Sequence, residues 1–418
     1  MRQPPLPRFR SPLRGPWLTA TFARVLLVGL PVVIVTGLLS YAAYEPRLAG
    51  NDTTPGAGLL RFYLFAWPTS PSWIYRLTQG VHVTLALVLI PVVLAKLWSV
   101  IPRLFVFPPV TSVAQAVERI SLLALVGGIL FEVITGVLNI QNDYVFGFSF
   151  YTAHLYGAWV FIAGFVVHVG IKLPTMRRAL RTRRLREELH VPLEATGPER
   201  TGLGIDDELV TRTPAPATMS RRGLLAVVTG AAALVGGLSV GQTLGGPLRR
   251  TALLSPRGRS YGSGPTDFQV NITAAAAGVA PAATGGAWRL AVTGPGGSKT
   301  LSRAELLAMD QHSYQLPIAC VEGWSSVQTW TGVRLRDLAA LVGARGHQVH
   351  VQSIQSFGFG SVRLSEGQVA DHATLLALKV NGADLTRDHG YPARMIIPGA
   401  PGVHCTKWVR QLSFEQPA

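Results

Sequence analysis

The sequence predicts an N-terminal all-α transmembrane four-helix bundle with a fifth membrane helix, followed by a C-terminal mixed α/β domain. Of the 418 residues, 48% are hydrophobic and 14% are charged, and the mean hydropathy is +0.31. This composition is too apolar for an ordinary soluble protein. Four long apolar runs come first and a fifth follows a polar segment. From residue 251 onward, the chain is less apolar and is interrupted by many Gly and Pro residues.

The formal net charge of +16 raises the question of a nucleic-acid partner. The basic residues, however, cluster beside the apolar runs, as they do on the cytoplasmic flanks of membrane helices. Because no basic-aromatic reading module accompanies them, we expect no nucleic-acid partner. The chain has two cysteines, Cys320 and Cys405, which cannot form a disulfide framework.

Four apolar runs are each long enough to cross a bilayer. They cover residues 17–44, 75–100, 117–140 and 150–173. The first is too long for a signal-peptide core, so we do not expect it to be cleaved. Arginines before it and a basic stretch from Lys172 to Arg186 place both ends of the four spans in the cytoplasm. The expected organisation is a cytoplasmic N-terminus (1–16) and a four-helix membrane domain (17–186), with the lipid bilayer as partner.

Three histidines lie within these runs, where ionisable groups are costly and usually functional. His82 lies about seven residues into an inward-running span, and His154 lies near the start of the fourth span, which also runs inward. Both are therefore expected near the outer face at similar height. Two imidazoles facing each other across a helix bundle form a bis-histidine haem b site. The alternative is a neutral imidazole that is hydrogen-bonded to a neighbouring helix.

The third histidine, His168, lies about four helical turns after His154, or roughly 21 Å, so the two cannot bind the same iron. Over about residues 17–175, four spans with this pair on the last one resemble the cytochrome b (gamma) subunit of formate dehydrogenase and b561-type membrane domains. The resemblance implies that each histidine binds a separate haem. The first span, which should supply the partner of His168, contains no histidine. One haem is expected near the outer face, and His168 is the candidate ligand of a second.

The polar, Pro- and Thr-containing residues 187–218 predict a cytoplasmic linker. A membrane anchor is expected over residues 219–250, where Arg221 and Arg222 precede about twenty apolar and small residues. This segment resembles a twin-arginine export signal in an internal position. On local sequence alone, an ordinary fifth span with a basic flank is an equal alternative. Five spans put residues 251–418 outside the membrane.

The C-terminal segment has the patterns of a mixed α/β fold. Trp288–Val292 alternates like a strand, and residues 349–354 and 393–397 also predict strands. Ser302, with Glu305 three residues later, predicts a capping box at the start of a short helix. There is no P-loop and no dinucleotide-binding fingerprint.

Cys320 lies between a short apolar run and a Gly/Trp turn. A thiolate suits a thiophilic transition metal, whereas the alternative is a buried structural thiol. The segment Cys320–Trp324, followed by Trp330–Val333, resembles the molybdenum-binding segment of the sulfite oxidase family, whose single cysteine ligates molybdenum. The resemblance implies a sulfite oxidase-like molybdopterin-binding fold in which Cys320 is the catalytic metal ligand.

Two more segments, 389–399 and 402–408, are similar to those with which that family holds the pterin and its phosphate. The resemblance extends over about residues 265–415. Arginine can bind phosphate oxygens in a bidentate manner and lysine adds a point charge, so the roles that it implies are physically reasonable. The implied cofactor-binding residues are Asn271, Cys320, His389, Arg394, Thr406 and Lys407.

One departure affects the predicted substrate. Sulfite-oxidising members follow the metal cysteine with an Asn-Arg-Arg run, whereas this chain has Val321–Trp324 with the acidic Glu322. An acidic neighbourhood disfavours a small dianion, so sulfite is not the leading substrate. In this respect the chain is nearer the periplasmic methionine sulfoxide reductase branch, which works with a separate haem membrane subunit.

The predicted function is that of a membrane-bound molybdenum oxidoreductase that transfers an oxygen atom to or from a small-molecule or sulfoxide-type substrate. Haem b would pass electrons to or from the quinone pool or another membrane redox partner. The expected location is the bacterial cytoplasmic membrane. The alternative is a non-catalytic haem- and cofactor-binding electron-transfer membrane protein.

Overall fold

The computed structural model describes residues 9–51, 65–105, 112–141, 145–201 and 207–416. Residues 1–8 of the predicted N-terminal segment and 202–206 of the predicted linker lie outside the described residues. The chain divides into two compact units. The first comprises Met1–Ile34 and Thr84–Gly237, and the second comprises Val35–Val83 and Leu238–Ala418.

Five helical segments among the described residues are long and apolar enough to cross a membrane. Their helices are α1 (Pro16–Ala43), α2 (Ile74–Val100), α3 (Val113–Gln141), α4 (Phe150–Leu180) and α6 (Arg221–Gly237). The second segment extends to Arg103 through the short helix η2 (Ile101–Phe105), and the fifth extends to Leu244. Each of the five predicted spans therefore falls on one of these helices.

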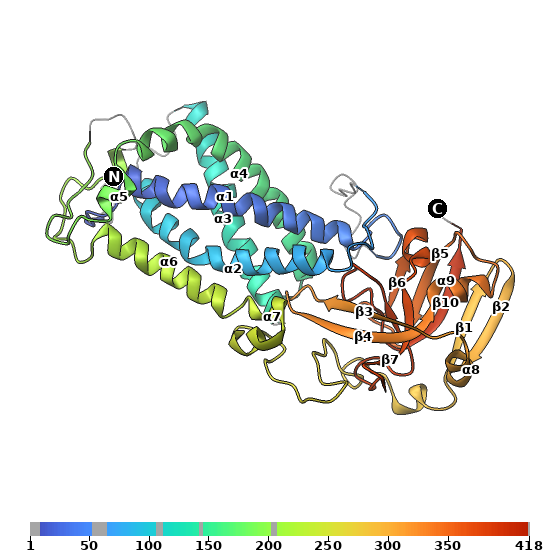
Figure 1. Cartoon of the computed structure of the whole chain (residues 1–418). Helices are drawn as coiled ribbons and strands as arrows, with labels where there is room; N and C mark the ends of the chain where they lie inside the picture. The colour runs from blue at the N-terminus through green and yellow to red at the C-terminus, as the bar shows by residue number, and fades with distance from the viewer. Residues whose placement is uncertain (1–8, 52–64, 106–111, 142–144, 202–206, 417–418) are drawn as a thin grey trace. The chain divides into compact units, whose positions relative to one another are not determined.

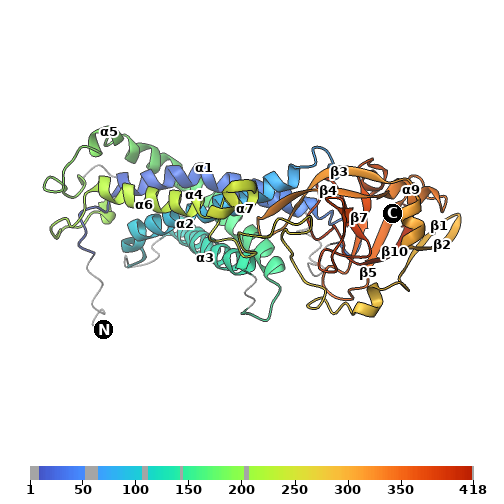
Figure 2. The same ribbon diagram turned by 60° about the horizontal axis from the view of Figure 1, so that its bottom comes forward.

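In the first unit, α1, α2, α3, α4 and α6 run alongside one another (Figures 1 and 2). Their shared core contains Trp17 and Phe22 from α1, Leu89 from α2 and Phe161 from α4. Leu224 and neighbouring apolar side chains of α6 pack against the same cluster. The fifth helix is thus packed into the bundle, because its apolar face has a partner there.

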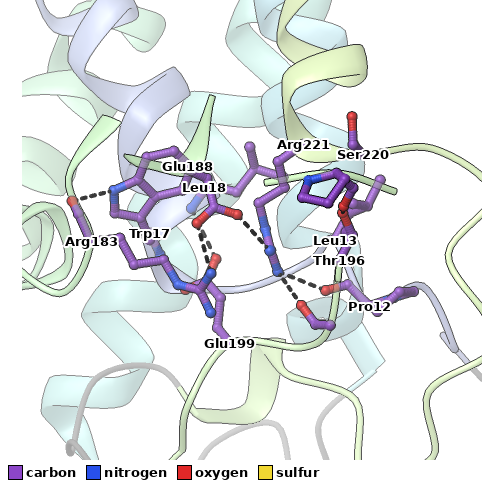
Figure 3. A network of polar contacts seen from close by, with 12 residues as sticks. Pro12, Leu13, Trp17, Leu18, Arg183, Glu188, Thr196, Glu199, Ser220 and Arg221 are labelled. Carbon is purple, nitrogen blue, oxygen red and sulfur yellow. Dashed lines mark hydrogen bonds and ion pairs between the residues drawn. The ribbon is translucent and has the colours of Figure 1, made fainter. Parts of the chain in front are cut away.

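The start of α6 is fixed by Arg221, whose side chain is 1% exposed. Its Nη1 donates to Glu188 Oε1 at 2.9 Å, and its Nη2 donates to the carbonyl oxygens of Pro12 at 2.9 Å and Gly197 at 2.8 Å (Figure 3). Glu188 ends the short helix α5 (Leu185–Glu188). Residues of the predicted linker and of the described N-terminal segment therefore take part in the packing at the start of α6.

Glu199, from the same predicted linker, caps the N-terminus of α1. Its carboxylate accepts hydrogen bonds from the backbone N–H groups of Trp17 at 2.8 Å and Leu18 at 3.2 Å. A helix N-terminus has free N–H groups and favours negative charge. Burial nevertheless raises the pKa of Glu199 above its ordinary value, and the two backbone hydrogen bonds offset only part of this effect.

The second unit contains two five-stranded sheets, one in the order β2-β1-β10-β5-β6 and one in the order β3-β4-β7-β8, with β9 paired to β7. The strands are β1 (Arg289–Gly294), β2 (Gly297–Ser302), β3 (His312–Ala319), β4 (Ser325–Arg334), β5 (Gln348–Ser353), β6 (Ser361–Leu364), β7 (Leu375–Val380), β8 (Ala383–Asp384), β9 (Arg394–Ile396) and β10 (Val409–Glu415). Strands β1 and β10 pair in parallel and the other paired strands are antiparallel.

Among the described residues of this unit, three short helices precede these strands in the chain, and three more lie between them. They are α7 (Gly241–Leu244), η4 (Gly246–Thr251), η5 (Pro281–Thr284), α8 (Arg303–Ala308), α9 (Leu335–Ala340) and α10 (Glu366–Ala370). The predicted capping box is confirmed: the Ser302 side chain accepts from the Glu305 N–H, and the Glu305 carboxylate accepts from the Ser302 N–H. The predicted strands correspond to β1, β5 and β9, each shifted by a residue or two. The mixed α/β prediction for this part is confirmed.

The ends of α1 and α2 that belong to the second unit pack on its sheets. The indole N–H of Trp67 donates to the Gly399 carbonyl at 2.7 Å, and Tyr75 shares a buried cluster with Ala319 at the end of β3. Asn51 exchanges two 2.8 Å hydrogen bonds with the backbone of Arg363 in β6. The chain leaving α1 and entering α2 is thus part of the fold that carries Cys320.

Candidate molybdenum and cofactor site

Cys320 occupies the tight turn that joins β3 to β4, strands that lie side by side in Figure 1. The Cys320 N–H donates to the Trp324 carbonyl, and the Gly323 N–H donates to the Cys320 carbonyl, both at 3.0 Å. Gly323 has φ +87, a conformation that favours glycine. The Gly-Trp sequence after the cysteine therefore closes the turn and fixes the thiol at the end of a strand.

The thiol of Cys320 is buried. Burial, with a smaller effect from the Glu322 carboxylate, raises the pKa of Cys320 to about 12. Without a bound metal ion, this group is therefore a neutral thiol at pH 7. Because thiol ligands coordinate as thiolates, metal binding here would release a proton.

Glu322 lies in the same turn, and its carboxylate is paired. Arg257 binds it in a bidentate manner, with Nε 2.9 Å from Oε2 and Nη2 2.6 Å from Oε1. The Trp324 indole N–H donates to Oε2 at 2.6 Å. This corrects the sequence argument, because a carboxylate neutralised by an arginine does not repel a small dianion as a free one would.

Arg394, on β9, is a buried cation held only by neutral groups of the described residues. It is 5% exposed, and it donates to the carbonyl oxygens of Cys405 at 3.1 Å and His389 at 3.4 Å. Burial lowers the pKa of Arg394 to about 10. Desolvating a cation costs free energy unless an anion accompanies it, so this position favours binding of an anion.

Lys407 is a second such cation. Its ammonium donates to the backbone carbonyls of Asp388, at 2.9 Å, and Ile272. Burial first, and then the nearby charge of Arg394, lower the pKa of Lys407 to about 6. Among the described residues, no carboxylate forms an ion pair with Lys407 or Arg394.

One small cavity collects most of the predicted cofactor-binding residues. It is lined by Phe268, Gln269, Val270, Asn271, Ile318, Trp324, His389, Arg394 and Lys407. The His389 ring stacks on Phe268 with centroids 3.8 Å apart, and its Nε2 lies 2.8 Å from the Thr266 carbonyl. Burial, with a smaller effect from Arg394, lowers the pKa of His389 to about 4.

Thr406 differs from these residues. It is buried, and its carbonyl accepts from the Met395 N–H at 2.9 Å, but it is not among the residues lining the cavity. Nearby, the buried Nδ1 of His404 has no hydrogen-bond partner among the described residues. Two buried basic side chains without a carboxylate partner among the described residues, next to a thiol-bearing turn, have the chemistry that an anionic, metal-bearing pterin requires.

Residues 277–417 match the family described as oxidoreductase molybdopterin binding domain. This part of the chain is thus a molybdopterin-binding oxidoreductase domain, homologous to that of sulfite oxidase. Mouse (Mus musculus) mitochondrial sulfite oxidase is 30% identical over 158 residues, which cover 31% of this chain and 29% of the mouse protein. The chain therefore spans under a third of that relative, and the family match at residues 277–417 does not include the helical unit.

Two other relatives are similar to this chain over a comparable length. An NADH nitrate reductase of Ulva prolifera is 35% identical over 104 residues, covering 22% of this chain and 12% of that protein. The uncharacterized oxidoreductase YuiH of Bacillus subtilis is 30% identical over 115 residues, covering 27% of this chain and 58% of that protein. The names sulfite oxidase and nitrate reductase differ in substrate, and the YuiH name states none, so the family match specifies the cofactor class and leaves the substrate open.

The three membrane histidines have distinct surroundings. On α4, His154 Nδ1 lies 3.0 Å from Thr135 Oγ1 and 3.1 Å from Glu132 Oε2 of α3. On α2, the His82 ring lies against Gly37, where an added Cβ would come within 2.8 Å of it. His168 Nδ1 is buried without a hydrogen-bond partner among the described residues. His82 and His154 belong to different compact units, so their pairing stays a prediction.

Proposed function

We propose that the protein is a membrane-bound, molybdopterin-dependent oxidoreductase that catalyses oxygen-atom transfer. The observation that supports this most strongly is the pair of buried cations, Arg394 and Lys407, in one cavity of the matched domain beside the Cys320 turn. When bound, the molybdenum cofactor supplies the oxygen-atom and electron chemistry, and the protein binds and orients it.

Each residue of the cavity has a defined role in this proposal. Arg394 and Lys407 bind the phosphate of the cofactor, because both cations lack a carboxylate among the described residues. His389 and Asn271 contact the pterin, and Cys320 binds molybdenum through its thiolate. Thr406 supports the site through the backbone of β9.

A haem b bound by His82 and His154 exchanges electrons between this centre and the quinone pool or another membrane redox partner. The contacts of His154 Nδ1 with Thr135 and Glu132 support this proposal. A hydrogen-bond partner on Nδ1 is how proteins orient an imidazole that binds a metal through Nε2. His168 is the proposed ligand of a second haem.

The proposed substrate is a sulfoxide or another small molecule that gives up or accepts an oxygen atom. Arg257 contacts the turn that holds Cys320, but its guanidinium binds the Glu322 carboxylate. Its charge is therefore already paired within the protein. This leaves the turn without a free cation of its own, which favours an uncharged substrate over a small dianion.

We further propose that the chain lies in the bacterial cytoplasmic membrane with the N-terminus inside and residues 251–418 outside, exported through Arg221 and Arg222. Arg222 is exposed, whereas Arg221 forms the buried pair with Glu188. Arg222→Lys therefore tests export without disturbing the bundle. Loss of protease access to the C-terminal domain from outside is the expected result, and unchanged access indicates an ordinary fifth span.

The proposed activity is tested by metal and pterin analysis of the purified full chain, with an optical spectrum of the same sample. We expect molybdenum and pterin in equal amounts together with a b-type haem spectrum. A preparation without molybdenum and pterin, from cells that make the cofactor, contradicts the proposal. Full cofactor content without oxygen-atom transfer to or from any sulfoxide or other small molecule supports the non-catalytic electron-transfer alternative.

A further inference from the structure

The metal-binding turn is held by side chains from outside the residues that match the molybdopterin family. On α2, Gln79 Nε2 donates to the Val321 carbonyl at 2.6 Å. On α7, Thr243 Oγ1 donates to the Gly323 carbonyl at 2.6 Å. These two acceptors lie on either side of Glu322, in the turn that begins at Cys320. All these residues belong to the second compact unit.

Both donors are buried and fixed in place. Gln79 is 3% and Thr243 8% exposed. The Ser40 hydroxyl, on α1, donates to Gln79 Oε1, so that the amide N–H₂ group of Gln79 faces Val321. The Thr243 carbonyl accepts in turn from Ser325 Oγ at 2.6 Å. Neither contact is a chance surface encounter, because each buried donor has a single well-defined acceptor.

The fit between the turn and these helices is close. A Cβ added to Gly323 would come within 2.8 Å of Val83 Cγ1, on α2, and within 3.1 Å of Gln242 Nε2, on α7. The turn itself uses the Cys320 N–H and carbonyl for its internal hydrogen bonds. Two of the remaining carbonyls, those of Val321 and Gly323, accept hydrogen bonds from the helices, as buried carbonyls require.

We propose that Gln79 and Thr243 are positioning residues for the Cys320 thiolate, so that the molybdenum centre is completed by the apolar helical segments of the chain. This rests on the proposed function of Cys320. Groups that fix a metal ligand in place set its geometry and tune the metal. Gln79 lies three residues before His82 on α2, so the same helix carries a support of the metal turn and a proposed haem ligand.

The test uses the full-length, cofactor-loaded protein and the variants Gln79→Leu and Thr243→Val. We expect each to keep wild-type molybdenum and pterin content but to shift the electron paramagnetic resonance signal of molybdenum and its midpoint potential. Turnover should fall by about 10- to 100-fold, the usual effect of removing a support of a metal ligand. Thr243→Ser keeps the hydroxyl and should restore the wild-type signal.

The matched controls are Thr78→Val and Thr251→Val, whose hydroxyls bond carbonyls of their own helices. Both should leave the signal unchanged. A wild-type signal and potential in Gln79→Leu and Thr243→Val, at full molybdenum content, overturn the inference while the proposed function stands. Absence of molybdenum from the wild-type protein instead contradicts the proposed function. If Gln79→Leu does not fold, the inference is tested by two other sets of variants. Ser40→Ala removes the hydrogen bond that orients the Gln79 amide, and Thr243→Val is compared with Thr243→Ser.

Discussion

Arg221 of the helical unit and Arg394 of the sheet unit are both buried arginines, but only one has an anion. Arg221 pairs with Glu188 at 2.9 Å and also donates to two backbone carbonyls. Arg394 donates to carbonyls alone, among the described residues. The charge of the first arginine is compensated within the chain, so its role is to hold the fold together.

The second arginine, Arg394, has no anionic partner among the described residues. A buried charge without a counter-charge is typical of a binding site. Hydrogen bonds to carbonyls satisfy the N–H groups of Arg394 but leave its charge desolvated and uncompensated. Lys407, in the same cavity, also donates to backbone carbonyls, and burial lowers its pKa to about 6, so an anion bound beside it would favour its charged form. A fold that keeps two such cations together is stabilised by an anion that binds there, whereas a fold with Arg221 and Glu188 needs none.

The largest expected effect comes from replacing Arg394, the arginine that has no anionic partner among the described residues. Arg394→Met should lower the affinity for the cofactor by roughly 30-fold or more, because a buried charge-assisted contact is lost, and turnover should fall with it. Stability of the cofactor-free protein should change little. Pterin content of the purified protein measures the effect, and Arg410→Met, at an exposed arginine of β10, is the control. Normal pterin content in Arg394→Met would contradict the comparison.

The next effect concerns the arginine with its own anion. Arg221→Met leaves the buried Glu188 with Arg183 as its remaining partner and should destabilise the helical unit by about 1–3 kcal/mol, without changing cofactor affinity. Removing both charges, in Arg221→Met with Glu188→Leu, should recover most of this loss. Thermal unfolding of the full chain in detergent measures both, with Arg222→Met as the exposed control. A double variant no more stable than the single one would show that the charge pair is not the cause.

Lys407 provides a pH test of the same difference. Its folded pKa in the cofactor-free protein is lowered to about 6, far below that of the unfolded chain. Between these values the unfolded state binds more protons, so stability should rise with pH from about 6 upward, by at most about 1.4 kcal/mol per pH unit. Unfolding midpoints of the cofactor-free protein between about pH 7 and 9 measure it.

Two comparisons sharpen this pH test. Lys407→Met should have a flatter pH profile than the wild-type protein, because the variant cannot titrate at this position. The cofactor-loaded protein should also be flatter, because a phosphate beside Lys407 favours its charged form. Equal slopes in all three preparations would remove Lys407 from the proposed phosphate site.

The smallest effect concerns Glu199, the carboxylate that caps α1. Glu199→Ala removes the acceptor of the Trp17 and Leu18 N–H groups and should cost about 0.5–2 kcal/mol. Glu194→Ala, at an exposed position of the same segment, should cost nothing measurable. Thermal unfolding of both variants measures the difference. A loss in Glu199→Ala no greater than in Glu194→Ala would show that the cap contributes nothing.

The sequence by itself determined what depends on neighbouring residues. Apolar runs long enough to span a bilayer predicted the five long helices, since length and hydropathy are local properties. The Ser302 capping box and the Gly-Trp turn after Cys320 are likewise formed by residues a few positions apart. The resemblance of short segments around Cys320, Arg394 and Lys407 pointed to the molybdopterin domain that the family match supports.

Only the tertiary structure decided which distant residues complete these local features. Gln79 and Val321 are separated by 242 positions, and nothing in either local sequence predicts their hydrogen bond. The pairing of Glu322 with Arg257, and of Arg221 with Glu188, likewise joins residues that are 65 and 33 positions apart. The physical reason is that the cost of burying a charge depends on its partners, and the fold of the whole chain chooses them.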